Sequence, residues 1–212
     1  MHLQLELLQC FNESKAVNDG LREVTLSTQR LRVLPPAVLS NPGLESLDLD
    51  RNKLRSITGI SKLCNLKRLI LSKNEIVDFP TEIQSLVCLE KLELNQNQIR
   101  VIPEGVFSHL PRLKHLRLNN NRLGALPKDL TACQGSLQYL NISNNLFRTF
   151  PQPVLQLAHL QELHITAMLM ERKSNLAHFI DNLEGSEEPE FYVDQWEKLK
   201  EMESCTLTVG LR

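Results

Sequence analysis

Leucine and isoleucine recur along this chain at a fixed spacing that also contains one asparagine. In the middle of the chain Leu89, Leu92, Leu94, Asn97 and Ile99 fit the frame L-x-x-L-x-L-x-x-N-x-L. The alternation of apolar and polar positions around Leu92 and Leu94 predicts a short strand with one apolar face. Because the frame returns every 22 to 24 residues, the sequence predicts a repeat protein.

Five units match this frame completely, and two further units are degraded. The complete units span residues 44–54, 66–76, 89–99, 113–123 and 137–147. The first degraded unit has Gln29 where asparagine is expected, and the last has Met168 there. One coil of this length cannot bury its own apolar residues, so neighbouring coils must stack on one another. The pattern therefore predicts an elongated domain with a shared core.

Many units also carry an apolar residue followed by proline shortly after the frame. These steps are Leu34-Pro35, Phe79-Pro80, Ile102-Pro103, Leu126-Pro127 and Phe150-Pro151. With this step and the short period, residues 21–165 resemble the leucine-rich repeat superfamily, in particular the intracellular Ras-suppressor-like class shared with Scribble-type scaffolds. The resemblance implies an α/β fold, a curved solenoid of about seven coils with a parallel, concave β-sheet and helical caps. The expected solenoid spans residues 21–170.

An asparagine lies where each predicted strand turns away from the sheet. An amide side chain both donates and accepts hydrogen bonds, so it can satisfy backbone groups that a buried turn leaves unpaired. We therefore interpret these asparagines as a structural ladder and not as ligand-binding residues. The ladder residues are Asn52, Asn74, Asn97, Asn121 and Asn145.

Caps are expected at both ends, because a solenoid must cover its terminal apolar faces. Residues 1–20 are assigned to an N-terminal cap. Residues 171–183 repeat apolar residues at helical spacing and are predicted to form a C-terminal capping helix. Residues 184–212 are expected to form an acidic linker and a short amphipathic tail, which folds back as cap, binds a partner or is disordered. The candidate contact residues of the tail are Tyr192, Trp196 and Leu199.

The composition favours an intracellular protein without a disulfide framework. The formal net charge is −1, and the 5 cysteines are scattered and odd in number, which is typical of a reducing compartment. The first residues lack the features of a secretory signal, and no apolar run is long enough to span a bilayer. We therefore expect a cytoplasmic location, with a nuclear one also allowed. Cys64 and Cys133 are assigned to equivalent repeat positions and are expected to be buried.

The sequence contains no recognised catalytic or cofactor-binding motif. Phosphate-binding glycine loops, a nucleophile elbow, paired cysteines and a helical zinc motif are all missing. We therefore expect no enzymatic activity, no cofactor, no metal and no small-molecule substrate. Nucleic acid is also disfavoured, because it would need a longer basic stripe with stacking aromatic residues.

The outward positions of the predicted sheet are the candidate surface for a protein partner. Arginine and tyrosine are enriched at energetically important contacts between proteins, and a basic centre would attract an acidic partner. The alternative is an ordinary solvated surface of mixed charge. The candidate residues are Arg68, Lys73, Lys91, Glu93, His115, Arg117, Arg122, Tyr139 and Asn141.

The resemblance implies an adaptor, a scaffold or a regulatory subunit. Its implied settings are small-GTPase or kinase signalling, phosphatase regulation and substrate recognition for a ubiquitin ligase. The alternative from another class is a secreted or cell-surface repeat protein. Under that alternative the sequons at Asn12 and Asn141 become glycosylation sites.

Overall fold

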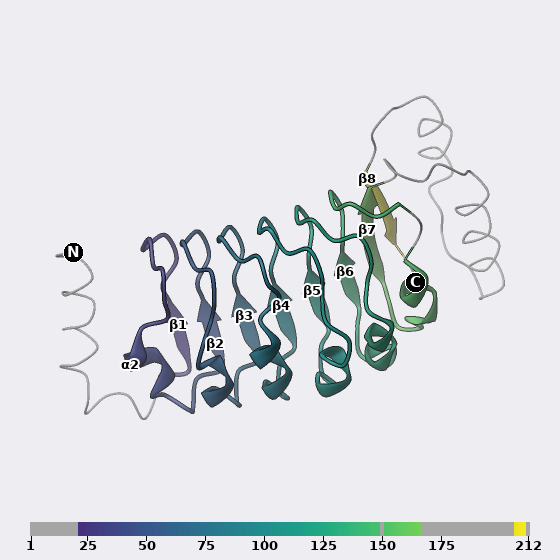
Figure 1. Cartoon of the computed structure of the whole chain (residues 1–212). Helices are drawn as coiled ribbons and strands as arrows, with labels where there is room; N and C mark the ends of the chain where they lie inside the picture. The colour runs from purple at the N-terminus through teal and green to yellow at the C-terminus, as the bar shows by residue number, and fades with distance from the viewer. Residues whose placement is uncertain (1–20, 149–150, 167–205, 211–212) are drawn as a thin grey trace.

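The computed structural model describes residues 21–148, 151–166 and 206–210, and in this part of the chain the coils stack into an open, curved solenoid (Figure 1). Each coil contributes one short strand to a parallel sheet. The strands are β1 (Glu23–Thr25), β2 (Ser46–Asp48), β3 (Arg68–Ile70), β4 (Lys91–Glu93), β5 (His115–Arg117), β6 (Tyr139–Asn141) and β7 (Glu162–Thr166). The solenoid with a parallel sheet that the frame predicts is confirmed.

The frame fixes the register of the sheet. Leu47, Leu69, Leu92 and Leu116 are cross-strand neighbours, and each of them is fully buried. In each three-residue strand the central residue points inward and its two neighbours point outward. Because adjacent strands lie about 4.8 Å apart, the outward side chains of successive coils stand in two closely spaced columns.

One strand lies within the segment that was assigned to the C-terminal tail. Thr206–Gly210 forms a strand, β8, which pairs antiparallel with β7 from Glu162↔Gly210 to Thr166↔Thr206. The edge of β7 offers unpaired backbone groups, and a neighbouring strand satisfies them. Other predictions for the ends lie outside the described residues: the caps at 1–20 and 171–183, and the tail residues Tyr192, Trp196 and Leu199.

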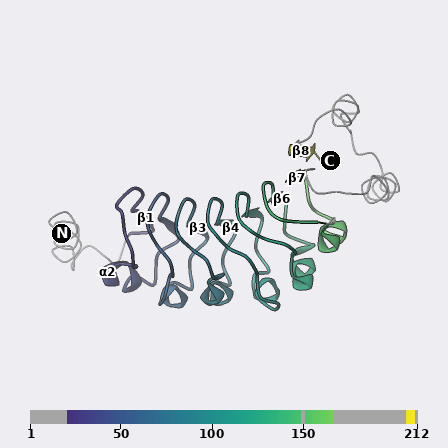
Figure 2. The same cartoon turned by 45° about the horizontal axis from the view of Figure 1, so that its top comes forward.

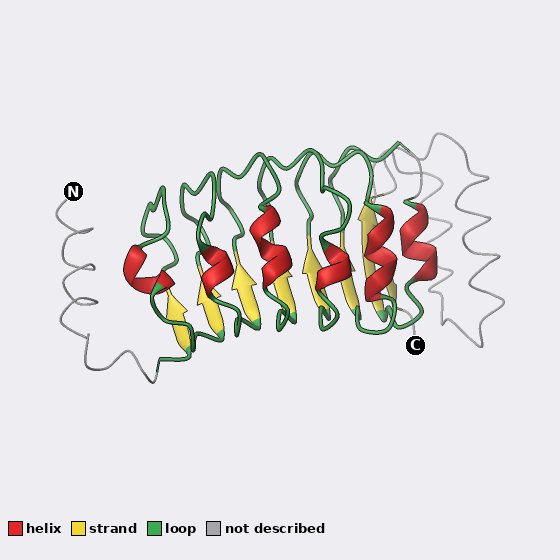
Figure 3. Ribbon diagram, turned by 60° about the horizontal axis from the view of Figure 1, so that its bottom comes forward, coloured by secondary structure: helices red, strands yellow, loops and turns green. Residues whose placement is uncertain are grey.

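Short helices line the side of the coils opposite the sheet (Figures 2 and 3). They are α2 (Pro36–Leu39), η3 (Ile60–Lys62), η4 (Thr81–Ser85), η5 (Phe107–His109), η6 (Lys128–Cys133) and η7 (Gln152–Gln156). Pro35, Pro80, Pro127 and Pro151 each precede one of these helices in an extended conformation. Proline fixes φ and has no N–H to donate, so it suits the segment that leads into a helix.

The position of a cysteine relative to the core between sheet and helices decides whether it is buried. Cys133 is buried because it takes the place that Leu86 and Leu110 take in neighbouring coils, and burial raises the pKa of its thiol to about 12. Cys64 is exposed, so the prediction that it is buried was wrong. Its coil already has Leu63 in that buried place, one residue earlier. The two cysteines are therefore not equivalent.

Each ladder asparagine joins two coils. The Asn97 side chain donates to the carbonyls of Leu71 at 2.9 Å and Leu94 at 3.0 Å, and its oxygen accepts from the Ile76 N–H at 3.1 Å. These buried groups would otherwise remain unsatisfied. The same three bonds recur in four other coils, at Asn52, Asn74, Asn121 and Asn145.

The residue before each ladder asparagine has a left-handed backbone, which is uncommon for residues other than glycine. The φ angles lie between 54° and 57° at Arg51, Lys73, Gln96, Asn120 and Asn144. The ladder hydrogen bonds hold this turn in place on every coil. The chain therefore turns sharply out of the sheet. The loops of these coils all begin at the same position relative to their strands.

Candidate functional site

The outward residues of β4, β5 and β6 form one continuous polar surface on the sheet. Register places Lys91, His115 and Tyr139 side by side in one column, and their strand neighbours in the other. Glu93 is buried and the other five residues are half-buried. These six residues are termed the concave patch: Lys91, Glu93, His115, Arg117, Tyr139 and Asn141.

Glu93 is the electrostatic centre of the concave patch. Its carboxylate lies 2.8 Å from Lys91 Nζ, 3.6 Å from His115 Nε2 and 4.0 Å from Arg117 Nε. The sequence predicts an outward residue here, but Glu93 is only 8% exposed. The side chains of Lys91, His115 and Arg117 lie against its carboxylate. The negative charge of Glu93 therefore partly neutralises the basic centre that the sequence predicts.

His115 is neutral in this environment near pH 7. Burial lowers the pKa of its imidazole to about 4, and the nearby Lys91 and Arg117 cations act in the same direction. The Glu93 and Glu162 carboxylates oppose this shift but do not cancel it. Within the described residues, His115 Nε2 and Arg117 Nε are buried atoms that make no hydrogen bond. Both atoms lie beneath the surface of the patch and face the Glu93 carboxylate at 3.6 Å and 4.0 Å.

Tyr139 anchors a cluster of rings. The His115 ring stacks on it at 4.1 Å with an interplanar angle of 9°, and the His164 ring lies 5.3 Å away. The Arg117 guanidinium lies over the tyrosine ring at 5.3 Å from its centroid. Asn141 Nδ2 donates to the tyrosine hydroxyl at 3.4 Å. These contacts from three neighbouring strands hold the ring in one orientation.

The structure separates the predicted surface into two regions. Arg68 lies on β3 beside Lys91 and extends the first column, but its side chain is exposed. Lys73 and Arg122 lie in the loops that follow β3 and β5, not on the sheet. These two residues therefore do not join the concave patch and belong to the edge of the solenoid.

Two residues of β7 complete the patch and were absent from the predicted set. Glu162 is the cross-strand neighbour of Tyr139, and His164 is that of Asn141. The His164 ring contacts the Glu162 carboxylate through Nε2. Their positions in the two outward columns were the signal, because any outward residue beside Tyr139 must line the same surface.

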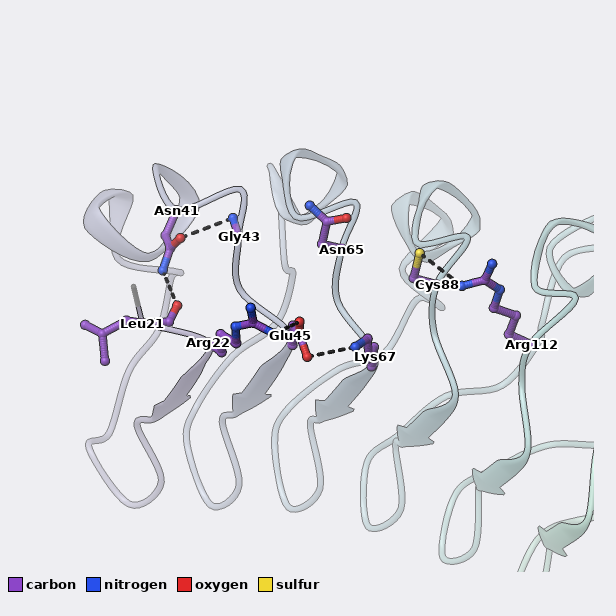
Figure 4. A pocket seen from close by; sticks show the side chains of 9 residues that line it. All are labelled: Leu21, Arg22, Asn41, Gly43, Glu45, Asn65, Lys67, Cys88 and Arg112. Carbon is purple, nitrogen blue, oxygen red and sulfur yellow. Dashed lines mark hydrogen bonds and ion pairs between the residues drawn. The ribbon is translucent and has the colours of Figure 1, made fainter. Parts of the chain in front are cut away.

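The amino-terminal ends of the strands border a shallow groove of about 450 Å³ (Figure 4). Glu45 lies 3.0 Å from Arg22 Nη1 and 2.8 Å from Lys67 Nζ, and a hydrogen bond from Lys67 is the main reason that the pKa of this carboxyl is lowered. Farther along, Arg112 donates to Cys88 Sγ at 3.8 Å. Arg22, Glu45 and Lys67 pair with one another, so we do not assign a binding site there.

The side chains of the concave patch are suited to binding another molecule. Within the described residues, no group of histidine, cysteine and carboxylate side chains is arranged to hold a metal ion. No helix in that part of the chain is long and apolar enough to cross a membrane. The patch instead offers a fixed aromatic ring and two partly exposed cations, Lys91 and Arg117.

Comparison with known proteins identifies the repeat. The leucine rich repeat profile matches residues 19–76, 64–123 and 88–147, which together make up more than half of the chain. The volume-regulated anion channel subunit LRRC8E of Xenopus tropicalis is 37% identical over 90 residues, which cover 41% of this chain and 11% of that protein. Leucine-rich repeat-containing protein 58 of Xenopus laevis is 34% identical over 120 residues, which cover 53% and 33% respectively.

A solved structure shows the same geometry. A leucine-rich repeat protein of Leptospira interrogans superposes with a TM-score of 0.64 at 33% identity, over 68% of this chain and 37% of that one. The chain thus spans about a tenth to a third of the length of the two curated relatives. Since the profile and the solved structure agree with the coil geometry, the chain belongs to the leucine-rich repeat family.

Proposed function

We propose that this chain is a non-catalytic adaptor, scaffold or regulatory subunit that binds an acidic protein partner through the concave patch. One observation carries the proposal: the patch combines a rigid aromatic ring with two cations that stay partly exposed. Tyr139 is held by contacts from three strands, while the Lys91 and Arg117 side chains are 30% and 40% exposed. A partner that supplies acceptors would reach these two cations.

Rigidity favours binding because a fixed ring loses little conformational freedom when a partner covers it. Tyrosine and arginine also dominate the binding energy of many protein interfaces. Glu93 holds the Lys91 ammonium at 2.8 Å and leaves its other N–H donors available. With Arg117 and Arg68 nearby, the surface keeps a net positive charge that attracts a carboxylate-bearing partner.

A cytoplasmic location and a Ras-suppressor-like role are part of the same proposal. Cys64, Cys88 and Cys133 are free thiols, which suits a reducing compartment. The repeat frame with its Leu-Pro step supports the assignment to that intracellular class. Small-GTPase, kinase, phosphatase and ubiquitin-ligase settings are all compatible with a surface of this kind.

A surface-exposed repeat protein is the second candidate, and the match to channel subunits favours it. The similarity covers only 11% of the Xenopus tropicalis channel subunit, so it concerns the repeats and not the channel as a whole. A glycan on Asn12 or Asn141 in cells would support this candidate. The Asn141 side chain is poorly available for glycosylation in this fold, because its amide oxygen accepts a hydrogen bond from the Ser143 N–H at 3.1 Å.

Quantitative affinity purification of the full chain from cells tests the proposal. Arg117→Ala combined with Tyr139→Ala removes the centre of the patch, so the main partner should be lost. The matched control, Arg112→Ala with His159→Ala, removes an arginine and a ring away from the sheet face and should retain the partner. Both variants should keep the wild-type circular dichroism spectrum. Unchanged partner recovery with the patch variant would place the interface elsewhere.

A further inference from the structure

The loops that follow the strands carry a strong local charge. These loops, residues 27–33, 50–56, 72–78, 95–101, 119–125 and 143–148, are termed the carboxyl edge. Each of the six contains at least one basic residue, and together they hold nine basic residues against three carboxylates, although the whole chain has a net charge of −1. The basic residues are Arg30, Arg32, Arg51, Lys53, Arg55, Lys73, Arg100, Arg122 and Arg148.

Most of these cations have no ionic partner within the described residues. Arg51 pairs with Asp50 at 3.3 Å and Arg55 pairs with Glu75 at 3.1 Å, and the other seven form no ion pair there. The opposite end of the strands differs, because Arg22, Lys67 and Lys114 all pair with glutamates from neighbouring coils. The carboxyl edge is therefore an unneutralised row of cations.

Apolar side chains lie between these cations. The described residues include seven large hydrophobic residues that are exposed, and four of them are on the carboxyl edge. Val101 is 68% exposed, Val33 64%, Leu146 55% and Val77 41%. They come from four different coils, so the row offers apolar contacts along most of its length. A surface that is both basic and apolar at regular intervals suits a partner with anionic groups above an apolar layer.

The carboxyl edge can meet a flat surface because its loops begin at the same height. The strands pair in register without offset, and the left-handed turn recurs at the end of β2 to β6. The loop tips accordingly lie in a row in two views of the molecule (Figures 1 and 3). Between the first coils, Arg32, Lys53, Arg55 and Glu75 line a hollow of about 180 Å³. Such a hollow accommodates a phosphate-sized group.

We propose that the carboxyl edge docks on an anionic membrane surface, with the Arg32, Lys53 and Arg55 hollow receiving a lipid phosphate. Nucleic acid fits less well, because no exposed aromatic side chain is available on these loops to stack on bases. A single acidic peptide also fits less well, because the cations spread over six coils and are not gathered in one groove. The docked molecule would hold its sheet face upright beside the membrane, available to a protein partner.

Sedimentation of the full chain with vesicles tests this proposal. Binding is expected to vesicles of phosphatidylcholine with phosphatidylserine, and not to phosphatidylcholine alone. It should weaken strongly between about 0.15 M and 1 M salt, as the screening length shortens from roughly 8 Å to 3 Å. Absence of binding to the anionic vesicles at low salt would overturn the proposal.

A matched pair of variants locates the contact. Arg32→Glu with Lys53→Glu should reduce vesicle binding at least about twenty-five-fold, since each cation near such a surface contributes roughly a factor of five. Lys62→Glu with Arg112→Glu makes the same change in charge away from the carboxyl edge and should reduce binding far less. Equal losses for the two pairs would show a general charge effect and would contradict the assigned edge.

Two further measurements separate a membrane from other anionic partners. Val33→Ser with Val101→Ser keeps the charge but removes apolar contacts, and vesicle binding should fall severalfold. Soluble polyglutamate at the same concentration of carboxylates should compete only weakly. Full displacement by polyglutamate, together with no effect of the valine changes, would assign the edge to an acidic protein and overturn the membrane proposal.

Discussion

The concave patch and the carboxyl edge differ in whether their charged side chains are paired. On the patch, Glu93 is within 4.0 Å of cationic or ring nitrogen atoms from Lys91, His115 and Arg117. On the edge, seven of nine cations form no ion pair within the described residues. The patch is organised by contacts between its own charged and aromatic side chains, whereas most cations of the edge are placed only by the loops that carry them.

This difference has an energetic meaning. An exposed cation remains hydrated and costs little, so the edge can keep unpaired charges without weakening the fold. A buried carboxylate needs partners, because desolvation would otherwise destabilise it. Changes in the patch should therefore alter the stability of the protein, and changes to the cations of the edge should alter mainly what it binds. The predictions below test this distinction.

The largest effect on stability is expected at the asparagine ladder, which fixes the turn between each strand and its loop. Asn97→Ala leaves the Ile76 N–H and the Leu71 and Leu94 carbonyls without a side-chain partner. Unfolding in urea should show a loss of about 1–3 kcal/mol in stability. Gln98→Ala, on the next residue, is the control and should change little. An unchanged unfolding curve for Asn97→Ala would contradict the structural role of the ladder.

The central carboxylates of the two regions should differ in importance. Glu93→Gln removes the charge that Lys91 and Arg117 share and should cost about 1–2 kcal/mol. Glu75→Gln breaks the more exposed pair with Arg55 on the edge and should cost less than about 0.5 kcal/mol. Equal losses in chemical unfolding would mean that the two regions do not differ in the way described.

Acid should weaken the patch and leave the arginines of the edge unaffected. The folded-state pKa of His115 is lowered to about 4 from the usual 6.5, so the unfolded chain binds this proton more readily. Its contribution is complete above pH 6.5 and is lost as the pH falls towards 4. Allowing for solvent screening, the loss between pH 7 and pH 5 should be about 1 kcal/mol.

Urea titrations at these two pH values measure that contribution. His115→Gln removes the titrating group, so its stability should fall less between pH 7 and pH 5 than that of the wild type. His109→Gln, on the helical side of the coils, should retain the wild-type dependence. If His115→Gln and the wild type lose the same stability, the imidazole does not carry the pH response.

The smallest effect, and one of opposite sign, is expected at the edge. Replacing Arg32 and Lys53 by alanine relieves repulsion between neighbouring cations, so stability should rise by a few tenths of a kcal/mol or stay constant. Thermal melting at low and high salt measures this, and the difference from the wild type should shrink at high salt. A loss above about 1 kcal/mol would show that these side chains hold the fold together.

Much of the fold followed from the sequence because its determinants are local. The frame sets which leucines are buried, and the spacing from Leu92 to Leu116 alone indicates which residues lie side by side on the sheet. The position of Asn97 likewise locates the turn that leaves the sheet. β8 could not be predicted in this way, because its pairing with β7 joins segments that share no repeat spacing.

The site followed from the sequence only in part. Register predicts that Glu93, His115 and Arg117 are neighbours, but not that the side chains around Glu93 lie against its carboxylate and leave it buried. Cys133 lies three residues after the buried Leu130, whereas Cys64 lies four residues after the buried Ile60, and this difference of one residue leaves Cys64 exposed. Lys73 was grouped with the sheet face, but it directly precedes the ladder residue Asn74, and its left-handed backbone places it in the loop after β3.

The antiparallel direction of β8 has a consequence for the length of the assembly. A parallel array of coils is a template for its own extension, since each new strand presents the same edge to the next one. The last strand here runs the other way and takes up the backbone groups of β7 along all five residues. A further coil of the same kind finds no matching edge at that end. β8 therefore ends the parallel arrangement that β1 to β7 share.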